Sequence, residues 1–590
     1  MFRFCLFLVY FGMVTCLQAQ KHDYVWQSGI NYTISNDSTV FAIDFKNVNP
    51  VLYKVSDSLL LADANISISD SSGNIAFYSN GCLIRNRAGH TMENGDFINS
   101  GTNPTIYYTH CGPSGLGSYP VVQGIFSLPF IENKYNLFYI KLDFNSDPWP
   151  NSMCKHNALQ YATINMDENQ GLGKVEMKDS VLLEGCFQIA VATKHANGRD
   201  WWILLADNTL GRFYRFLQTP EGIQGPWYQD IENQTSTDTF FYAGWTEFSP
   251  DGTRLMINDI QTGVALYDFD RCNGLLSSPL FLPANHQVNG HGYGAAFSPD
   301  NKFLYIVRGA SKRLEQYDLT STNVATSKFI VAEWDGAFDT LQPSGTLVQT
   351  FFYHFQHGPD GKLYNWAGSS RFMHVVNFPN RSGAKCAFRQ RSLRLLNFSP
   401  NPNAYYPNYR LGPVDGSVCD TLGINNVPIA LFRHDWEDSS LVLQRTFTDL
   451  SYYEPAFWSW DFGDGTVSAD TSPVHTFPQA GTYNVCLTVS NPYGTDTFCR
   501  EVTVGTSSVV TPELLKLVVA PNPASETVRF SLPGVSGRLL LLDVQGRNVH
   551  EQSFESQAEV NVRQLAPGLY LYKLAGTRGG SWSGKLVIQR

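Results

Sequence analysis

The sequence predicts an all-β protein whose N-terminal part is built from repeated units of short strands. The segment Glu247–Ile257 (EFSPDGTRLMI) recurs as Ala296–Ile306 (AFSPDNKFLYI), and Asp251 and Asp300 are 49 positions apart. In each copy proline presets a tight turn, aspartate caps its own backbone, and Gly or Asn takes the left-handed position. The apolar residues that follow alternate at period two, which predicts a strand with one buried face. A repeat of about 40–50 residues made only of short strands is typical of β-propeller blades.

Looser copies of this turn and strand extend in both directions. One lies downstream at Gly358–Tyr364, and three lie upstream at Ala196–Ile203, Glu132–Ile140 and Asp70–Tyr78. Spread over residues 20–415, the repeats predict a propeller of seven blades, with six and eight as the alternatives. We expect the opening strand, Thr39–Phe45, to complete a blade begun by the last strands of this domain, because a closed ring has no free sheet edge.

The composition fits strand-rich structure and excludes one class of partner. Aromatic residues make up 14% of the 590 positions and charged residues only 16%, which suits large side chains packed between sheets. The formal net charge is −10, and no cluster of Lys and Arg is present that could neutralise a run of phosphates. A nucleic-acid partner is therefore not expected.

The first residues form a targeting segment. Met1–Arg3 carries a positive charge, Phe4–Leu17 is apolar, and a small residue precedes the expected cleavage between Ala19 and Gln20. Cys16 suggests a lipoprotein as the alternative, but Met13–Thr15 lacks the small residue expected beside a lipidated cysteine. No other stretch approaches the ~20 apolar residues of a membrane span. Residues 1–19 are interpreted as a signal peptide, and the mature chain is expected to enter the periplasm without a transmembrane segment.

The cysteines fit an oxidising compartment. Eleven are present, two of them in the leader, and none lies in a Cys-x-x-Cys pair that would favour zinc. Cys486 and Cys499 flank the turn Asn491–Gly494 symmetrically, which places them opposite each other on two antiparallel strands. We expect a disulfide between them.

Several sequence segments of the N-terminal domain resemble those of a family of secreted propeller proteins from the Bacteroidota. They are Ile66–Asn74, Asn169–Gly173, Lys194–Trp202 and the closing phrase Pro407–Pro413. The resemblance implies the propeller fold and brings no established activity with it.

A second domain is expected at residues 424–505. Trp460 and Phe462 point to one face before a hairpin turn at Asp464, and Tyr483–Val489 alternates as a core strand. This segment resembles the PKD domain, a small immunoglobulin-like sandwich. Asp461 and Asp464 are interpreted as turn caps; calcium is the alternative, without a supporting motif, and no other cofactor or metal is expected.

A short polar linker at residues 506–512 precedes a third all-β unit at residues 513–590, expected to be a small β-sandwich. Its opening Ala520–Pro523, its hairpin Pro567–Tyr570 and its ending Gly584–Ile588 resemble the subtype A C-terminal sorting domain of type IX secretion cargo. The resemblance implies contact with the type IX secretion machinery, passage through the outer membrane, cleavage of this domain, and either surface attachment or release.

No catalytic motif is present among those with a defined spacing. The chain has no Gly-x-Ser-x-Gly, no His-Glu-x-x-His and no phosphate loop, and Gly290–Gly294 precedes a strand instead of a helix. The odd spacing of His354 and His357 sends their side chains to opposite faces of a strand, which disfavours a metal site. The absence of these catalytic motifs favours a non-catalytic binding or adhesion protein for a glycan or protein ligand. The alternative is a secreted hydrolase or lyase of polysaccharide or protein with a propeller catalytic domain.

Candidate ligand-binding residues lie in long loops, where function concentrates on a rigid scaffold. The strand aromatics Trp201, Tyr267 and Tyr317 are expected in the core. The long segments Gly95–Tyr119 and Asp143–His156, together with Gly290–Gly294, supply rings suited to sugars or peptides. The predicted binding residues are Tyr107, Tyr108, Trp149, His291 and Tyr293.

Overall fold

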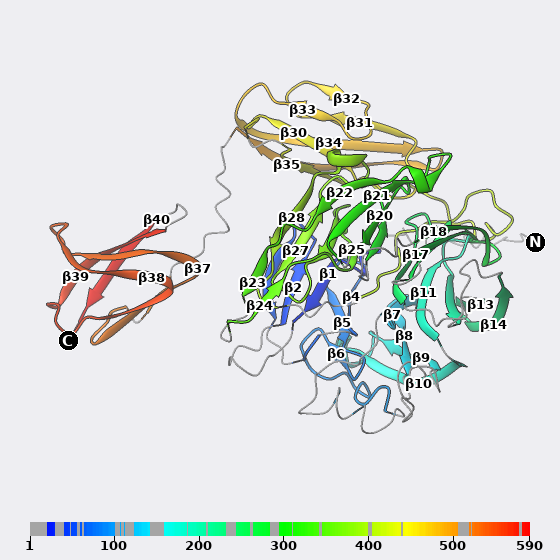
Figure 1. The fold of residues 1–590 in the computed structure, drawn as a ribbon, viewed down its shortest axis with the longest axis horizontal. Helices are drawn as coiled ribbons and strands as arrows, with labels where there is room; N and C mark the ends of the chain where they lie inside the picture. Colours follow the sequence, from blue (N-terminus) through cyan, green and yellow to red (C-terminus); the bar gives the residue numbers. More distant parts are fainter. Residues whose placement is uncertain are drawn as a thin grey trace, which may run out of the picture. The chain divides into compact units, whose positions relative to one another are not determined.

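The computed structural model shows three all-β parts (Figure 1). It describes residues 20–589 except 30–39, 48, 56–58, 62–63, 101–106, 108–110, 112–122, 142–157, 186, 208–210, 232–242, 260–262, 284–293, 309–310, 341–344, 399–403, 438–439, 506–517, 521 and 577–580. None of the helices in these ranges is long and apolar enough to cross a membrane.

The N-terminal part is a propeller whose described residues form seven blades, as the sequence predicts. Buried apolar clusters join successive blades around the ring, including the last blade to the first, where Trp366 and Met373 pack with Trp26 and Phe41. The predicted core aromatics Trp201, Tyr267 and Tyr317 are all buried.

The first four blades contain strands of antiparallel sheets with the following bounds. Blade 1 has β1 (Val25–Ser28), β2 (Val40–Asp44) and β3 (Val51–Val55); blade 2 has β4 (Ile66–Ser69), β5 (Ile75–Ser79) and β6 (Ile84–Asn86); blade 3 has β7 (Ile125–Ile131), β8 (Lys134–Lys141), β9 (Ala158–Asn165) and β10 (Lys174–Glu184), with the 3-10 helix η2 (Asn169–Gly171); blade 4 has β11 (Phe187–Lys194), β12 (Trp201–Asp207), β13 (Arg212–Thr219) and β14 (Gly222–Asp230).

The remaining blades have four strands each. Blade 5 has β15 (Ala243–Phe248), β16 (Arg254–Asp259), β17 (Gly263–Asp270) and β18 (Leu275–Pro283); blade 6 has β19 (Ala295–Phe297), β20 (Phe303–Arg308), β21 (Arg313–Asp318) and β22 (Phe329–Glu333), with η3 (Val324–Thr326); a small hairpin has β23 (Phe338–Thr340) and β24 (Leu347–Gln349); blade 7 has β25 (Phe355–His357), β26 (Leu363–Trp366), β27 (Phe372–Val376) and β28 (Phe388–Arg394), with η4 (Gly383–Cys386).

The repeated turns of the sequence all join the first and second strands of blades 2 to 7. In blade 5 the Ser249 hydroxyl donates to Asp251 Oδ1 at 2.5 Å, and in blade 6 the Ser298 hydroxyl donates to Asp300 Oδ1 at 2.6 Å. The equivalent turns therefore lie at one end of the propeller, which we call the mouth. The repeated turns of the sequence therefore also form one surface of the ring, at the mouth.

The predicted closure of the ring is wrong in one respect. Within the predicted segment Thr39–Phe45, β2 pairs with β1 on one side and β3 on the other, and blade 7 has four strands of its own. The prediction rested on the general advantage of a ring without free sheet edges, and here the ring closes through the packing of blade 7 against blade 1. Blade 1 is therefore built from the N-terminal strands.

The segment 404–410, which follows the last blade, lies along the axis of the propeller. Three tyrosine hydroxyls of this segment reach strands of three different blades: Tyr405 donates to Ala192 O at 3.0 Å, Tyr409 donates to Ser127 O at 2.8 Å, and Tyr406 lies 2.9 Å from the Ser67 hydroxyl. Only a segment inside the ring can contact β11, β7 and β4 together. This axial segment leaves the ring at the mouth and continues into the second domain.

The second domain is a sandwich of two antiparallel sheets, one with strand order β29-β30-β33 and one with β32-β31-β34-β35. Trp460 and Phe447 fill its core. Cys486 and Cys499 form the disulfide that the sequence predicts. The strands are β29 (Phe432–Asp435), β30 (Gln444–Asp449), β31 (Phe457–Asp461), β32 (Val467–Ser468), β33 (Val474–Thr476), β34 (Gly481–Asn491) and β35 (Gly494–Val504).

Buried ionic contacts fasten the second domain to blade 7. Lys362 Nζ lies 2.8 Å from Asp435 Oδ1, and Arg433, which is 2% exposed, donates to the carbonyls of Asp360 and Asn377 at 3.1 and 2.6 Å. Although burial by itself would raise the pKa of Asp435, Arg433 and Lys362 hold it below its usual value. A charged pair this buried is expensive to separate, so the contact fixes the second domain at the mouth.

The third part, residues 504–590, is a compact unit of its own. Its longest strand changes partner at a register shift between Ser531 and Ser536, pairing with β36 before it and with β39 after it. Phe530 from one half and Leu541 from the other enter the same core, so the sheet folds over itself. The strands are β36 (Val518–Ala520), β37 (Thr527–Leu542), β38 (Asn548–Asn561), β39 (Gly568–Gly576) and β40 (Ser581–Ile588).

Candidate functional site

A cavity of about 430 Å³ lies at the mouth of the propeller. Its walls are the repeated turns of blades 5, 6 and 7, the axial segment, and the loop 449–454 of the second domain. The volume lies within the ~300–1,000 Å³ range of ligand pockets. We call this space the mouth cavity; it is the candidate functional site.

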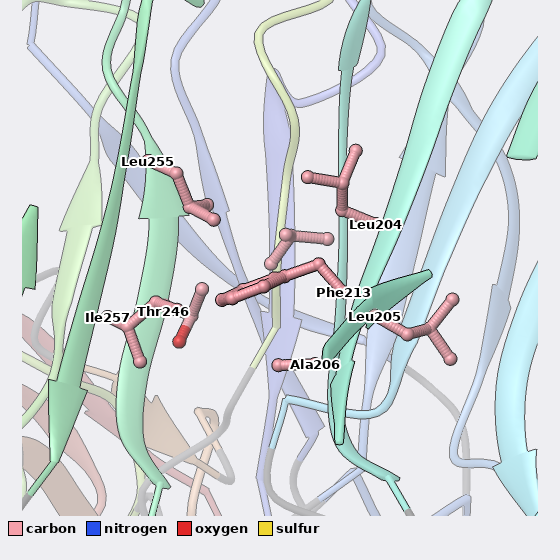
Figure 2. Close-up of a pocket in the computed structure, with 8 residues that line it drawn as sticks. Leu204, Leu205, Ala206, Phe213, Thr246, Leu255 and Ile257 are labelled. Carbon is pink, nitrogen blue, oxygen red and sulfur yellow. The ribbon is translucent and has the colours of Figure 1, made fainter. Parts of the chain in front are cut away.

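A smaller void lies between blades 4 and 5 (Figure 2). It measures about 10 Å³ and is lined by seven apolar side chains and Thr246. A space of this size holds at most one water molecule, and a water needs at least two polar partners to stay there. The void is a packing gap and carries no function.

Glu247 and His357 lie side by side in the wall of the mouth cavity. Glu247, 6% exposed on β15, accepts hydrogen bonds from Trp245 Nε1 at 3.2 Å and from the Phe297 backbone N–H at 2.9 Å. His357 Nε2 lies 3.4 Å from Glu247 Oε1. His354 packs against Trp245 at 5.0 Å and does not line the cavity. The carboxylate is fixed by two donors before any ligand enters.

Arg410 forms the floor of the cavity. Its guanidinium donates two parallel hydrogen bonds to Asp23, one of them 2.6 Å from Nη2 to Oδ2, and lies over the rings of Tyr24 and Tyr452 at 5.8 and 5.3 Å. Burial alone would lower the pKa of Arg410, but Asp23 holds it well above its usual range. The positive charge is therefore neutralised within the wall.

The second domain contributes a strained loop to the opposite wall. Tyr453 and Glu454 are consecutive residues with φ of 64° and 54°, in the left-handed region that non-glycine residues seldom adopt. Asn491 Nδ2 holds the loop by donating to the carbonyls of Asn426 and Tyr453 at 2.6 and 3.0 Å. Such backbone strain is typical of binding and active sites, where surrounding contacts maintain it.

Two carboxyl groups of this wall titrate above their ordinary range. Burial raises the pKa of Asp449, which accepts hydrogen bonds from Ser451 and Trp458. Burial and then the charge of Asp415 raise the pKa of Glu454, against the opposing effect of Arg271. The raised pKa values mean that the charged forms of Asp449 and Glu454 are unfavourable in the free protein. A cation bound beside them would stabilise these charged forms.

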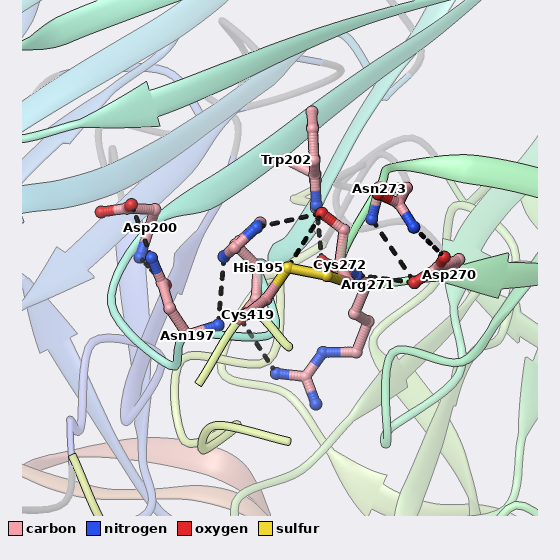
Figure 3. Close-up of a disulfide and its surroundings, with 9 residues drawn as sticks. All are labelled: His195, Asn197, Asp200, Trp202, Asp270, Arg271, Cys272, Asn273 and Cys419. Carbon is pink, nitrogen blue, oxygen red and sulfur yellow. Dashed lines mark hydrogen bonds between the residues drawn. A yellow bond between two sulfur atoms is a disulfide. The ribbon is translucent and has the colours of Figure 1, made fainter. Parts of the chain in front are cut away.

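The phrase Lys194–Trp202, which carries part of the family resemblance, is a structural clamp beside the mouth (Figure 3). Because the Asn197 backbone N–H donates to His195 Nδ1 at 3.0 Å, the imidazole carries its proton on Nε2 and donates to Cys272 O at 3.1 Å. Cys272 forms a disulfide with Cys419. The clamp thus fastens the chain that leaves the axial segment to blade 5.

Arg271 and Lys194 complete this clamp without entering the mouth cavity. Arg271 donates to the carbonyls of Lys194 and Gly412 at 3.0 and 2.5 Å. Lys194 is 3% exposed and donates to Gly198 O at 3.1 Å, and burial followed by the nearby Arg271 lowers its pKa to about 7. Neither side chain lines the cavity, so both are interpreted as structural.

Of the sequence-predicted binding residues, the structure describes Tyr107 alone. Tyr107 is buried, and its hydroxyl donates to Cys82 O at 3.4 Å, beside a Cys82–Cys111 disulfide. Tyr108, Trp149, His291 and Tyr293 lie outside the described residues. β8 and β18 end, and β9 and β19 begin, at the end of the propeller opposite the mouth. The role of the predicted residues in binding stays a prediction.

The acidic turn of the second domain has the geometry of a cap. Asp461 Oδ1 accepts the Gly463 backbone N–H at 2.9 Å, and Asp464 Oδ1 accepts the Thr466 N–H at 3.0 Å. Asp464 Oδ2 also lies 2.7 Å from His475 Nε2. Within the described ranges, no three His, Cys, Asp or Glu side chains form a group that could hold a metal ion.

Comparisons with known proteins identify two of the three parts. Residues 425–505 match the PKD domain model, and residues 518–589 match the model of the secretion system C-terminal sorting domain. The chain therefore contains a PKD domain and a type IX sorting domain, the two resemblances that its motifs predict. The sorting domain directs the protein to the cell surface or the extracellular space by contact with the type IX secretion machinery.

Curated and solved relatives cover parts of the chain. The pre-pro-metalloprotease PrtV of Vibrio cholerae serotype O1 is 33% identical over 87 residues, which is 15% of this chain and only 9% of the relative's length. The solved PKD1 domain of that metalloprotease is 28% identical, covering 14% of this chain and 99% of the domain, with a TM-score of 0.13. A putative 6-phosphogluconolactonase from Bacteroides uniformis is 12% identical, covering 60% of this chain and 91% of its own, with a TM-score of 0.28.

Proposed function

We propose that the protein is a non-catalytic surface protein that binds a glycan or protein ligand in the mouth cavity. The observation that supports this proposal is the cavity itself, whose walls come from three propeller blades, the axial segment and the PKD domain. Loops carried on rigid strands are a common setting for binding sites. The PKD domain then completes the site as one of its walls.

Engaged carboxylates favour binding over turnover. Glycoside hydrolysis needs one carboxyl group free to donate a proton and another free to act as base or nucleophile. Asp251 and Asp300 each accept a hydroxyl and a backbone N–H of their own turn, and Glu247 accepts two further donors. These groups are held as acceptors, and Asp449 accepts two further donors, so Glu454 is the one cavity carboxyl group left without a hydrogen bond or ion pair in the described residues. One free carboxyl group does not supply both of the roles that hydrolysis needs. Hydrolysis or cleavage of polysaccharide or protein is the alternative function.

The loops at the opposite end of the propeller are proposed as a second contact surface. Their candidate residues are Tyr108, Trp149, His291 and Tyr293, chosen because rings beside polar groups suit sugars and peptides. Tyr107, predicted with them, is buried. The proposed domain bounds are residues 20–415 for the propeller, 424–505 for the PKD domain and 513–590 for the sorting domain, with the linker at 506–512.

Blocking the mouth cavity tests the proposed function. Asn380 is exposed, lines the cavity and contributes one hydrogen bond, from the Asp300 N–H to its Oδ1 at 3.1 Å. Asn380→Trp should abolish binding of whichever ligand a panel of glycans and proteins identifies. The control is Gln224→Trp, on the exposed outer strand of blade 4. Unchanged binding by Asn380→Trp, or turnover of a panel member, would contradict the proposal.

A further inference from the structure

The mouth cavity carries an excess of negative charge. Six carboxylates and one guanidinium line it, and the guanidinium of Arg410 is already paired with Asp23. Asp300 lies 3.3 Å from Lys302 Nζ, so four carboxylates remain without a cationic partner in the described residues other than His357, which lies beside one of them. They belong to Glu247, Asp251, Asp449 and Glu454. A concave site of one sign attracts ligands of the opposite sign and repels its own.

Amide groups without partners line the same cavity. Gln356 is 8% exposed, and its side-chain amide has no hydrogen-bond partner in the described part of the chain. Asn301 and Asn380 use their amide oxygens to accept the backbone N–H groups of Asp251 and Asp300, which leaves their Nδ2 groups unbonded within the described ranges. These amide groups line the cavity and are available to a partner that comes from outside.

Charge and amides together specify one class of ligand. Unbonded amide N–H groups suit the carbonyls of a peptide backbone, and unpaired carboxylates suit ammonium or guanidinium groups. Hydroxyl groups of a neutral sugar would satisfy the amides but leave four carboxylates uncompensated. We infer that the mouth cavity binds a basic peptide segment of a partner protein, with a Lys or Arg side chain near Glu454 and Glu247. This inference rests on the proposed function and narrows it to a protein ligand.

Glu454 offers the cleanest test of the inference. It is exposed, and its carboxylate has no hydrogen bond or ion pair in the described residues, so its loss removes charge without removing a structural contact. Glu247 is less suitable because it also holds the Phe297 N–H. A matched control is Glu501→Gln, which removes the same charge from an exposed position of β35 outside the cavity.

Calorimetric titration of the full mature protein with short probes measures the preference. Acetylated, amidated tri-lysine should bind, tri-serine should bind far more weakly, and tri-glutamate should not bind. Glu454→Gln should weaken tri-lysine binding about fivefold, and Glu501→Gln should leave it unchanged. Raising the salt from about 0.05 to about 0.5 M should weaken binding further, because the attraction is between charges.

Each contrary outcome has a distinct meaning. If a neutral N-acetylglucosamine trisaccharide binds and tri-lysine does not, the ligand is a glycan, which overturns the inference but leaves the proposed function intact. If tri-lysine binds equally to wild type and Glu454→Gln, the cavity is not its site, and the inference is overturned. If Asn380→Trp also leaves every identified ligand bound, the proposed function falls with it. Absence of binding by all probes likewise overturns the inference.

Discussion

Replacing Asp23 with Asn should destabilise the propeller by about 3–5 kcal/mol. Asp23 is the charged partner of Arg410 in the cavity floor, and Gln20 O, at 3.5 Å, is the one further acceptor among the described residues. Removing one member of a buried ion pair leaves an uncompensated charge, which costs about 3–5 kcal/mol. The rings of Tyr24 and Tyr452 offset part of this, about 1 kcal/mol.

Urea unfolding of the mature chain, followed by tryptophan fluorescence, measures this loss. The double variant Asp23→Asn/Arg410→Met should be markedly more stable than the sum of the single effects predicts, because it removes both charges. The control is Asp96→Asn, whose partner Lys178 lies at 3.3 Å in an exposed pair and should cost less than about 1 kcal/mol. A loss below about 1 kcal/mol for Asp23→Asn, or additivity in the double variant, would refute the reasoning.

Three further predictions concern stability and export. Cys272→Ser with Cys419→Ser should lower the free energy of unfolding by about 5 kcal/mol, because the disulfide closes a loop of 147 residues; an unchanged urea midpoint would contradict this. Burial lowers the pKa of His22 to about 4, below the ~6.5 of an unfolded chain, so the unfolded state takes up the proton first. The stability that neutral His22 contributes, about 3 kcal/mol, should be present above pH 6.5 and be lost as the pH falls to 4. His22→Gln should reduce the change in the free energy of unfolding over this pH range. Truncation after Pro512 should trap the chain in the periplasm, with Gln20 as its N-terminus; efficient surface delivery of the truncated protein would show that the sorting domain is dispensable.

Local signals in the sequence predicted most of the strand framework. The Pro-Asp-Gly turns mark the first hairpin of successive blades because tight turns depend on a few neighbouring residues. The Cys486–Cys499 disulfide followed from the symmetry of one hairpin. The Cys272–Cys419 pair was missed, since no local pattern relates positions 147 residues apart.

The candidate site could not be predicted in the same way. Its walls meet only because the axial segment passes through the ring and the PKD domain docks on blade 7 through Arg433. Glu247 and His357 are 110 positions apart in the sequence. The one available signal was the Pro407–Pro413 phrase, which holds Asn408 and Arg410, both of them in the cavity wall. The repeated turns were recognised as structure, and their shared location at the mouth was not.

Hydrogen–deuterium exchange with a bound ligand tests the central claim most directly. With the ligand that the glycan and protein panel identifies, amides of the turns at 299–301 and 358–361 and of the loop 449–454 should become protected together. The outer strand β14 should not change. Protection confined to the loops at 95–119, 143–156 and 290–294, with no change at the mouth, would contradict the assignment of the mouth cavity as the binding site.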